Sequence, residues 1–407
     1  SPLDPGQGLP RMNAEGLRGL APSRDDPTLQ RLPRRAAIYC VGGAVRDVLL
    51  GEAALDRDYL VTGVTPQEMT EAGFRAVGRD FPVFLHPVSH SEYALARTER
   101  KSGQGYKGFV FYTGPEVGLE EDLQRRDLRI NAMAVDSDGV LHDPMQGQED
   151  IHQKTLRHVS PAFREDPLRL LRLARFGARW PAFSVAPETL QLCAEIVASG
   201  ELGALVAERV WAEVEKGLLA TAPGRMMAIL DDLAAWPSLV GSSERPTPGP
   251  VSLATAHALG LPGPALAGVL MNERPPGRLA AVLPRAVQEW RQLIAAGLAS
   301  PAWAGLWSIP TATAQQASGL AQAVLDWAER ADLFRHPDRT GPLTQLALSQ
   351  ANALAALEQV QSVLEGLVQC SVGDAAKQAA RSGEPIALAV QRHRLSWLSQ
   401  ALANREH

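Results

Sequence analysis

Hydrophobic and polar positions follow two different patterns along the chain. Between residues 37 and 144, short apolar runs end in glycine, proline or a charged residue and predict strands: "AAIYCVGG", "DRDYLVTG", "FPVFLHP", "EYALAR" and "GFVFYTG". Two segments among them have helical spacing: "AVRDVLLG", with a glycine stop, and "TPQEMTEAGF", with a threonine N-cap and a following proline. After Pro161 almost every segment has helical spacing. The pattern predicts an α/β region followed by helices to the end of the chain.

Two segments lack either periodicity. Residues 1–36 mix prolines and glycines with arginines and aspartates, which predicts a disordered or loosely attached extension. The segment Gly241–Val251, "GSSERPTPGPV", has the composition of a linker. The helical segments after it recur without a fixed period, so the pattern does not indicate a solenoid.

Composition narrows the class of protein. A chain of 407 residues exceeds one ordinary core, and 45% hydrophobic with 21% charged residues is typical of globular domains. With no apolar window of about 18 residues and no charged-then-apolar leader, we expect a cytoplasmic protein without a membrane span. The net charge of -5 argues against a uniformly basic surface but not against a local basic groove. The cysteines Cys40, Cys193 and Cys370 are in no metal-ligand spacing, and Cys40 is expected to be buried.

Two aspartates stand close together after the first glycine pair. If the segment is a strand, Asp56 and Asp58 project from the same face while Arg57 points away. Two adjacent carboxylates repel each other unless a cation lies between them, and oxygen ligands of this kind suit Mg²⁺. The alternative is a pair of solvated aspartates on an edge strand or turn.

The glycine pair adds a second feature. Gly42 and Gly43 allow the backbone N–H groups at a helix start to approach an anion, and Arg46, one turn further on, can reach a phosphate. The alternative is an ordinary strand-to-helix turn. A phosphate cradle followed by a metal-binding pair is what a two-metal phosphoryl or nucleotidyl transferase requires.

"GGAVRDVLLG" followed by "DRD" resembles the signature of the class II tRNA nucleotidyltransferases, the CCA-adding enzymes. This family belongs to the polymerase-beta-like superfamily and shares its head domain with bacterial poly(A) polymerases. The resemblance is dense from about Ile38 to Leu219, and four further motifs appear in the family's order. They are "RRDLRINAMA" (Arg125–Ala134), "DPMQGQEDI" (Asp143–Ile151), "EDPLRLLRLARF" (Glu165–Phe176) and "ERVWAEVEKGL" (Glu208–Leu218).

The resemblance implies an α+β fold. A nucleotidyltransferase head with a small mixed β-sheet and flanking helices is expected over residues 37–150. An all-α neck that carries a base-reading helix is expected over 151–240, and a helical body and tail that bind tRNA over 241–407.

The resemblance also implies roles for individual residues. Asp56 and Asp58 are expected to be catalytic and to hold Mg²⁺, which activates the RNA 3′-hydroxyl and neutralises the departing pyrophosphate. Glu92 is a candidate third carboxylate, with a surface glutamate as the alternative. The nucleotide-binding residues are expected to be Gly43, Arg46 and Arg126 at the triphosphate, and Asp127 and Asn131 at the ribose. For "RRDLRIN" the alternative is a solvated helical face.

The motif at Glu165–Phe176 resembles the base-reading helix of the family. Asp166, Arg169, Arg172 and Arg175 recur every three residues and form one broad stripe on a helix. An aspartate that accepts from an exocyclic amine, beside an arginine that donates to a ring nitrogen, fits cytosine and adenine and rejects guanine and uracil. The alternative is a basic face that contacts RNA phosphates or solvent.

Two segments bear on the exact activity. "RTERKSGQGY", Arg97–Tyr106, has the pattern of a surface loop and resembles the flexible element of enzymes that add the complete CCA. Where relatives carry the His-Asp dyad of a metal-dependent phosphohydrolase, this chain has Met271 and Asn272, and only His257 and His336 lie between residues 220 and 380. We therefore expect no phosphohydrolase activity.

The function expected from the resemblance is template-independent addition of C, C and A to tRNA 3′ ends. The expected partners are the tRNA acceptor stem and 3′ end, CTP and ATP, with no membrane and no DNA. The alternatives are a poly(A) polymerase or CC-only enzyme of the same family and, more remotely, a non-catalytic RNA-binding protein. The sequence does not determine the oligomeric state.

Overall fold

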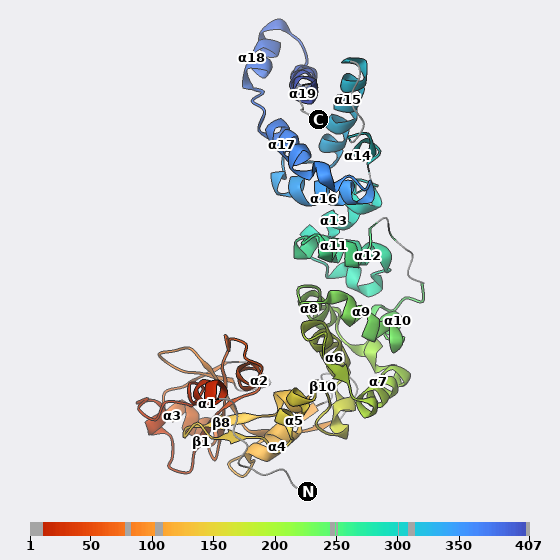
Figure 1. Cartoon of the computed structure of the whole chain (residues 1–407). Helices are drawn as coiled ribbons and strands as arrows, with labels where there is room; N and C mark the ends of the chain where they lie inside the picture. Colours follow the sequence, from red (N-terminus) through yellow and green to blue (C-terminus); the bar gives the residue numbers. More distant parts are fainter. Residues whose placement is uncertain are drawn as a thin grey trace. The chain divides into compact units, whose positions relative to one another are not determined.

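The chain divides into two compact units, one ending at Gly241 and the other beginning at Ser242, at the start of the linker-like segment. A computed structural model describes residues 11–77, 83–101, 109–244, 249, 251–299, 301–307 and 314–403. Within these residues all strands lie in the first unit, and the second is helical (Figure 1). The predicted α+β fold, with a mixed sheet followed by helices, is confirmed.

The first unit is built on a seven-stranded mixed sheet with the order β3-β4-β5-β2-β1-β8-β9. All neighbouring strands are antiparallel except β2 and β5, which are parallel. The strands are β1 (Ala37–Val41), β2 (Asp58–Thr62), β3 (Arg75–Val77), β4 (Val83–Leu85), β5 (Glu92–Leu95), β8 (Ala134–Asp136) and β9 (Leu141–His142).

Helices cover both faces of this sheet. Successive residues of β1 point to opposite faces, so Cys40 packs in a cluster with Val45 of α2 while Val41 packs with Leu123 of α4. Burial raises the pKa of Cys40 to about 12, as expected for a small core residue. The helices are α1 (Arg11–Arg18), α2 (Gly43–Leu49), α3 (Pro66–Glu71), α4 (Leu119–Gln124) and α5 (Gly147–His152).

The predicted loose extension over residues 1–36 is wrong for the part that the structure describes. Leu17 and Leu20 are buried against α2, and Leu29 and Leu32 belong to a second core cluster. Burial of these four leucines removes apolar surface from water and so opposes the entropy cost of ordering this proline-rich segment.

The surface-loop prediction for Arg97–Tyr106 is wrong over its first half. β6 (Arg97–Lys101) pairs antiparallel with β7 (Phe109–Thr113), and residues 102–106 lie outside the described residues. Strand pairing uses backbone groups, so a charged segment joins a ladder when an apolar strand lies opposite it.

The rest of the first unit is mostly helical. α6 packs on α8 and α9, and Leu170, Leu171 and Ala174 on its inner face are inaccessible to solvent. The packing is close at Gly177, where a Cβ would lie 2.5 Å from the Ile229 Cδ1 atom and would force that side chain to shift. The helices are α6 (Leu168–Arg179), α7 (Pro187–Ser199), α8 (Ala207–Leu218), α9 (Pro223–Asp232) and α10 (Trp236–Val240), and two short strands, β10 (Thr155–Leu156) and β11 (Ser184–Val185), pair in parallel.

The second unit contains only helices and their connections in its described part. The Asn272 amide donates to the Arg291 carbonyl at 2.9 Å and so joins α12 to α13, while Met271 is buried. No described helix is both long and apolar enough to cross a membrane. The helices are α11 (Leu253–Ala258), α12 (Gly263–Glu273), α13 (Arg285–Ala295), α14 (Trp303–Leu306), α15 (Ala314–Arg330), α16 (Thr340–Gln350), α17 (Leu357–Gln369), α18 (Gly373–Ser382) and α19 (Ile386–Ala403).

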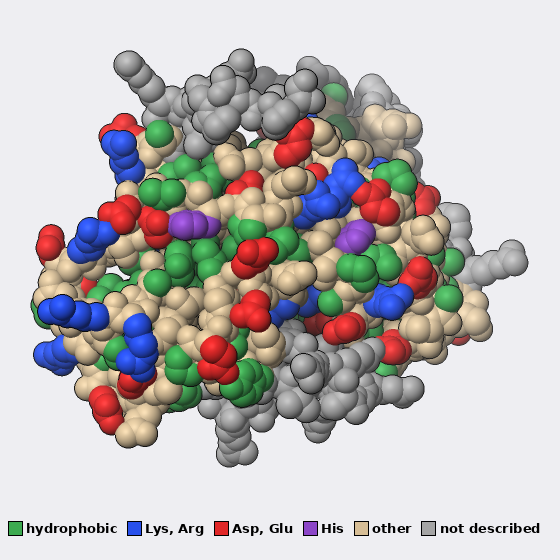
Figure 2. Space-filling view, turned by 90° about the horizontal axis from the view of Figure 1, so that it is seen from below, with side chains coloured by type: hydrophobic (Ala, Val, Ile, Leu, Met, Phe, Trp, Pro, Cys, Tyr) green, Lys and Arg blue, Asp and Glu red, His purple; other side chains and the backbone are tan. Residues whose placement is uncertain are grey.

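Charge is mixed on the surface that Figure 2 shows. Lysine and arginine side chains are interspersed with aspartates and glutamates, and hydrophobic side chains lie among them. This face is therefore not a continuous basic surface, in keeping with the net charge of -5.

Candidate active site

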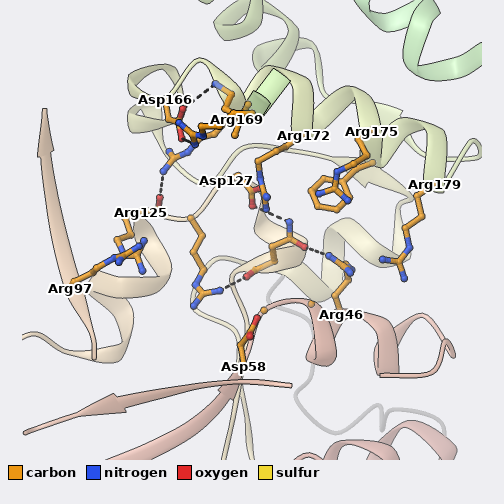
Figure 3. Close-up of a pocket in the computed structure, with 17 residues that line it drawn as sticks. Arg46, Asp58, Arg97, Arg125, Asp127, Asp166, Arg169, Arg172, Arg175 and Arg179 are labelled. Carbon is orange, nitrogen blue, oxygen red and sulfur yellow. Dashed lines mark hydrogen bonds and ion pairs between the residues drawn. The ribbon is translucent and has the colours of Figure 1, made fainter. Parts of the chain in front are cut away.

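A cavity of about 510 Å³ lies in the first unit between one end of the seven-stranded sheet and helix α6 (Figure 3). The turn after β1, the start of β2, the start of β6 and the segment after α4 form one side of it, and α6, the residues just before it and α8 form the other. Nine arginines and three aspartates line it: Arg46, Arg97, Arg125, Arg126, Arg169, Arg172, Arg175, Arg179 and Arg209, with Asp58, Asp127 and Asp166. So strong a positive charge in a concave site attracts polyphosphate anions.

The structure brings together ten of the twelve residues proposed from the sequence. The exceptions are Asp56, which precedes β2, and Glu92, neither of which lines the cavity. Those that line it are Gly43, Arg46, Asp58, Arg126, Asp127, Asn131, Asp166, Arg169, Arg172 and Arg175.

Asp56 and Asp58 are not both on β2, contrary to the sequence prediction. The strand begins at Asp58, so Asp56 lies in a bend and the same-face argument does not apply to it. Asp58 is instead in register with Glu92 of the parallel neighbour β5, which places these two side chains on one face of the sheet. Arg57 turns away and donates to the Gly19 carbonyl at 2.9 Å.

The donor chemistry at this sheet end fits a hard divalent cation. Asp56 and Asp58 are exposed, and neither makes an ion pair with another residue that the structure describes. No cluster of three or more His, Cys, Asp or Glu side chains arranged for a metal occurs among the described residues. One or two protein carboxylates suit an ion such as Mg²⁺, which completes its coordination shell with substrate phosphates and water.

The glycine turn brings its backbone close to an arginine. Gly42 has a φ of 73°, and a Cβ there would lie 2.9 Å from the Arg126 Nη1 atom. A side chain at Gly42 would therefore be strained by the backbone and would also displace Arg126 from the cavity wall.

Arg46 is more buried than the sequence indicates. It is 5% exposed, donates to Asp47 at 2.8 Å and to the Asn131 side chain at 2.5 Å, and lies over the rings of Phe176 and Trp180. Desolvation lowers the pKa of this guanidinium, although the Asp47 charge opposes the shift. Arg46 thus joins α2 to α6 as well as lining the cavity.

Asp127 and Asn131 are close together, but not on the helix that the sequence predicts. α4 ends at Gln124, and a short 3₁₀ turn covers Arg129–Asn131. The Asn131 amide donates to the Asp127 carboxylate at 3.0 Å, and Arg172 donates to its other oxygen at 2.7 Å. Burial alone would raise the pKa of Asp127, but the Arg172 charge and these hydrogen bonds hold it well below its usual range.

Asp122 is a buried anchor that the sequence reading did not single out. Its fully buried carboxylate accepts from the side chains of Arg125 at 2.9 Å and Arg126 at 3.2 Å, and from the Arg97 backbone N–H at 3.3 Å. One carboxylate therefore orients three residues of the cavity wall.

We predict that Asp122→Asn lowers the free energy of unfolding of the first unit by about 2 kcal/mol at neutral pH, since it loses charge-assisted hydrogen bonds. Desolvation raises the pKa of Asp122, but the charges of Arg125 and Arg126 outweigh it and lower the pKa. The contribution is therefore fully present above the unfolded-state pKa of about 3.9 and is lost as pH falls through the lower folded-state pKa. Urea titrations should give a constant difference between wild type and variant from pH 5 to 7 that shrinks below pH 4. A difference that grows on acidification would contradict this account.

The arginines of α6 are held by partners from other elements of the first unit. Arg169 donates to the backbone carbonyls of Arg125 at 2.5 Å and Ala162 at 3.0 Å, and Arg175 donates to Glu213 of α8 at 2.6 Å. Asp166 precedes the helix and accepts from the Leu168 N–H at 3.0 Å. The predicted stripe is thus an aspartate at the helix start followed by arginines in fixed orientations.

Four cationic residues of the cavity were not proposed from the sequence: Arg97, Arg125, Arg179 and Arg209. Arg179 follows Arg175 by four residues and continues the same helical face, so its spacing was a usable signal. Arg125 and Arg209 lie within quoted motifs, but nothing in their spacing shows that they converge.

Residues 38–157 match the model of the poly(A) polymerase head domain. Over 327 residues the chain is 48% identical to a CCA-adding enzyme of Bordetella pertussis, covering 79% of this chain and 85% of the relative. The chain belongs to the CCA-adding enzyme family. The resemblance proposed from the motifs is thereby confirmed.

Other members of the family extend the comparison. A multifunctional CCA protein of Dechloromonas aromatica is 61% identical over 203 residues, which cover 50% of this chain and 49% of that protein. A solved complex of a CCA-adding enzyme with CTP has a TM-score of 0.63 at 20% identity and covers 98% of this chain and 96% of its own. The Thermotoga maritima CCA-adding enzyme complexed with tRNA has a TM-score of 0.61 at 21% identity and covers 98% and 97%. These structural matches confirm the fold.

Proposed function

We propose that this enzyme adds C, C and A to the 3′ end of tRNA from CTP and ATP, with Mg²⁺ as the metal ion. The observation that carries the proposal is the 48% identity to a CCA-adding enzyme over 79% of the chain. The arginine-lined cavity with Asp58 at its sheet end supplies the chemistry such an enzyme needs.

Asp56 and Asp58 are the residues that would hold Mg²⁺, with Glu92 in register beside Asp58 as a further carboxylate. The bound ions would activate the 3′-hydroxyl and neutralise charge on the departing pyrophosphate. The triphosphate is bound by Gly43 and Arg126, next to the glycine turn after β1. Arg46 acts from its buried position by fixing Asn131.

The ribose and base are positioned from α6 and the segment before it. Asp127 and Asn131 form one hydrogen-bonded unit that contacts the ribose, and Arg172 is aligned by the same aspartate. Asp166 accepts from the exocyclic amine of cytosine or adenine while an arginine of α6, Arg172 or Arg175, donates to the adjacent ring nitrogen. Arg169 supports the helix, since its donors are used on backbone carbonyls.

We assign the head to residues 37–150, the neck to 151–240 and the body and tail to 241–407. Basic residues of the neck and tail bind the acceptor stem through its phosphates, so affinity should fall as salt rises. Because tRNA is the proposed substrate, we propose a cytoplasmic location. The absence of phosphohydrolase activity stays a prediction; it is supported by Asn272, whose amide is bound to backbone carbonyls.

The test is incubation of a tRNA transcript that lacks its 3′ CCA with the protein, Mg²⁺ and labelled CTP or ATP, singly and together. Growth by three nucleotides that needs both substrates is the expected result. A stop after two cytidines would indicate a CC-only enzyme, and a long ladder with ATP alone a poly(A) polymerase. RNA binding without extension by a folded sample would favour the non-catalytic alternative.

A further inference from the structure

A second set of contacts joins the head to the far end of α6. Glu52 follows α2 in the chain, and its carboxylate accepts from the Trp180 indole N–H at 2.7 Å and from Arg179 at 2.5 Å. The hydrogen bond to the indole spans 128 residues of sequence. Burial would raise the pKa of Glu52, but the hydrogen bonds from Trp180 and Arg179 lower it, so the group is a carboxylate near neutral pH.

The contact extends beyond Glu52. Trp180 stacks on Phe176 at 5.5 Å between ring centroids, and the guanidinium carbons of Arg46 and Arg179 each lie 4.7 Å from the Trp180 ring centroid. Asp47 accepts from both arginines, at 2.7 Å from Arg46 and 3.2 Å from Arg179. We call Arg46, Asp47 and Glu52 with Phe176, Arg179 and Trp180 the α2–α6 contact.

This contact gives α6 a second point of attachment. Near its first turns the helix is held by Arg169 on the Arg125 carbonyl and by Arg172 on Asp127. The two attachments hold opposite ends of the helix, in addition to its packing on α8 and α9. Arg175 lines the cavity between the two attachments and donates to Glu213 of α8.

We propose that Glu52 is a positioning residue for nucleotide selection. Through Trp180 and Arg179 it fixes the end of α6, and so the arginines that discriminate CTP and ATP from UTP and GTP. The inference rests on the proposed function. Glu52 does not line the cavity, so it would act through Trp180 and Arg179.

Stability alone does not account for this arrangement. The Glu52 and Arg179 side chains are 37% and 34% exposed, and ion pairs of such exposure add little to stability. A small displacement of groups that position a substrate, in contrast, has a large effect on its use. Loss of Glu52 should therefore reduce selectivity more than it reduces stability.

The experiment compares Glu52→Ala, Glu52→Gln and Trp180→Phe with wild type and with Glu71→Gln, an exposed glutamate of α3 that also accepts from a side-chain N–H. It measures kcat/KM for CTP and for UTP on one tRNA, CTP and UTP binding by calorimetry, and hydrogen exchange over residues 176–180. We expect the CTP preference of Glu52→Ala to fall about tenfold or more while kcat with CTP changes little.

The variants also separate the contacts. Glu52→Gln should retain part of the preference, because its amide oxygen still accepts from Trp180, and Glu71→Gln should match wild type. Because Glu52 and Trp180 touch, the double variant Glu52→Gln/Trp180→Phe should be less impaired than the sum of the single effects. Each variant that loses CTP preference should also show faster hydrogen exchange at residues 176–180.

Equal loss of CTP and UTP use in Glu52→Ala would overturn the proposal, since it would show a structural role alone. An unchanged preference would overturn it as well. If the wild type extended no RNA, the proposed function would fail. The calorimetric CTP preference and the exchange of α6 would then still decide whether Glu52 sets nucleotide selection.

Discussion

Asp58→Asn is expected to lower nucleotidyl transfer by at least about a thousandfold, with little change in stability. The amide keeps the size of the side chain but removes the charge that holds a divalent cation, and charge stabilisation by such an ion is worth several kcal/mol in the transition state. Asp58 is exposed at the start of β2 and its side chain makes no ion pair with a described residue, so the fold does not depend on its charge. Single-turnover addition of CMP to tRNA lacking CCA measures the effect.

Asp138→Asn is the matched control, because Asp138 is an exposed aspartate beyond β8 that does not line the cavity. It should retain the wild-type rate. Titration with Mg²⁺ adds a second readout, since Asp58→Asn should need a higher concentration for its residual activity. A rate within tenfold of wild type at every Mg²⁺ concentration would exclude Asp58 as a metal ligand.

Arg172→Ala is expected to destabilise the first unit by about 3 kcal/mol, because it leaves a buried carboxylate without its ion-pair partner. The Asp127 side chain is 8% exposed, and Arg172 donates to it at 2.7 Å. The Asn131 amide and the Leu128 N–H still donate to Asp127 in the variant. The loss of stability is therefore at the lower end of the range for a broken buried ion pair. Urea titrations of wild type and variant give the difference.

Two further variants test the cause of this loss. Arg172→Ala/Asp127→Asn should be more stable than Arg172→Ala, because the second change removes the unpaired charge. It should not recover use of CTP, since the arginine donor is still missing. Arg164→Ala, which removes an exposed pair with Glu195, should shift stability by no more than about 0.5 kcal/mol. A double variant as unstable as the single one would show that the pair is not the source of the effect.

Parts of the site could be read from the sequence because each motif lies on one element. The glycine turn and Arg46 come from a single strand-helix connection, and the arginines of α6 from one helical period, so spacing alone placed them on a common face. Even within these motifs, the bounds of the elements differ from those that the sequence predicted. The strand at Asp58 begins too late to include Asp56, and residues 129–131 form a 3₁₀ turn instead of an α-helix.

Contacts between distant segments could not be read in this way. Asp127 accepts a hydrogen bond from Arg172, which lies 45 residues further along the chain. The buried Asp122 accepts hydrogen bonds from three residues of the cavity wall. Neither aspartate has a spacing that points to its partner. Their roles follow from burial, since a buried carboxylate must find donors wherever the packing supplies them.

By itself, the sequence of this protein determined the α+β class, the family and the set of polar residues that carry its chemistry, because periodicity and motif order are local properties of a chain. The tertiary structure alone decided that Arg46 is buried against Phe176 and Trp180, that Glu92 stands in register with Asp58, and that Glu52 anchors the end of α6. Those arrangements depend on how sheet and helices pack, and packing distributes its constraints over residues that are far apart in the chain.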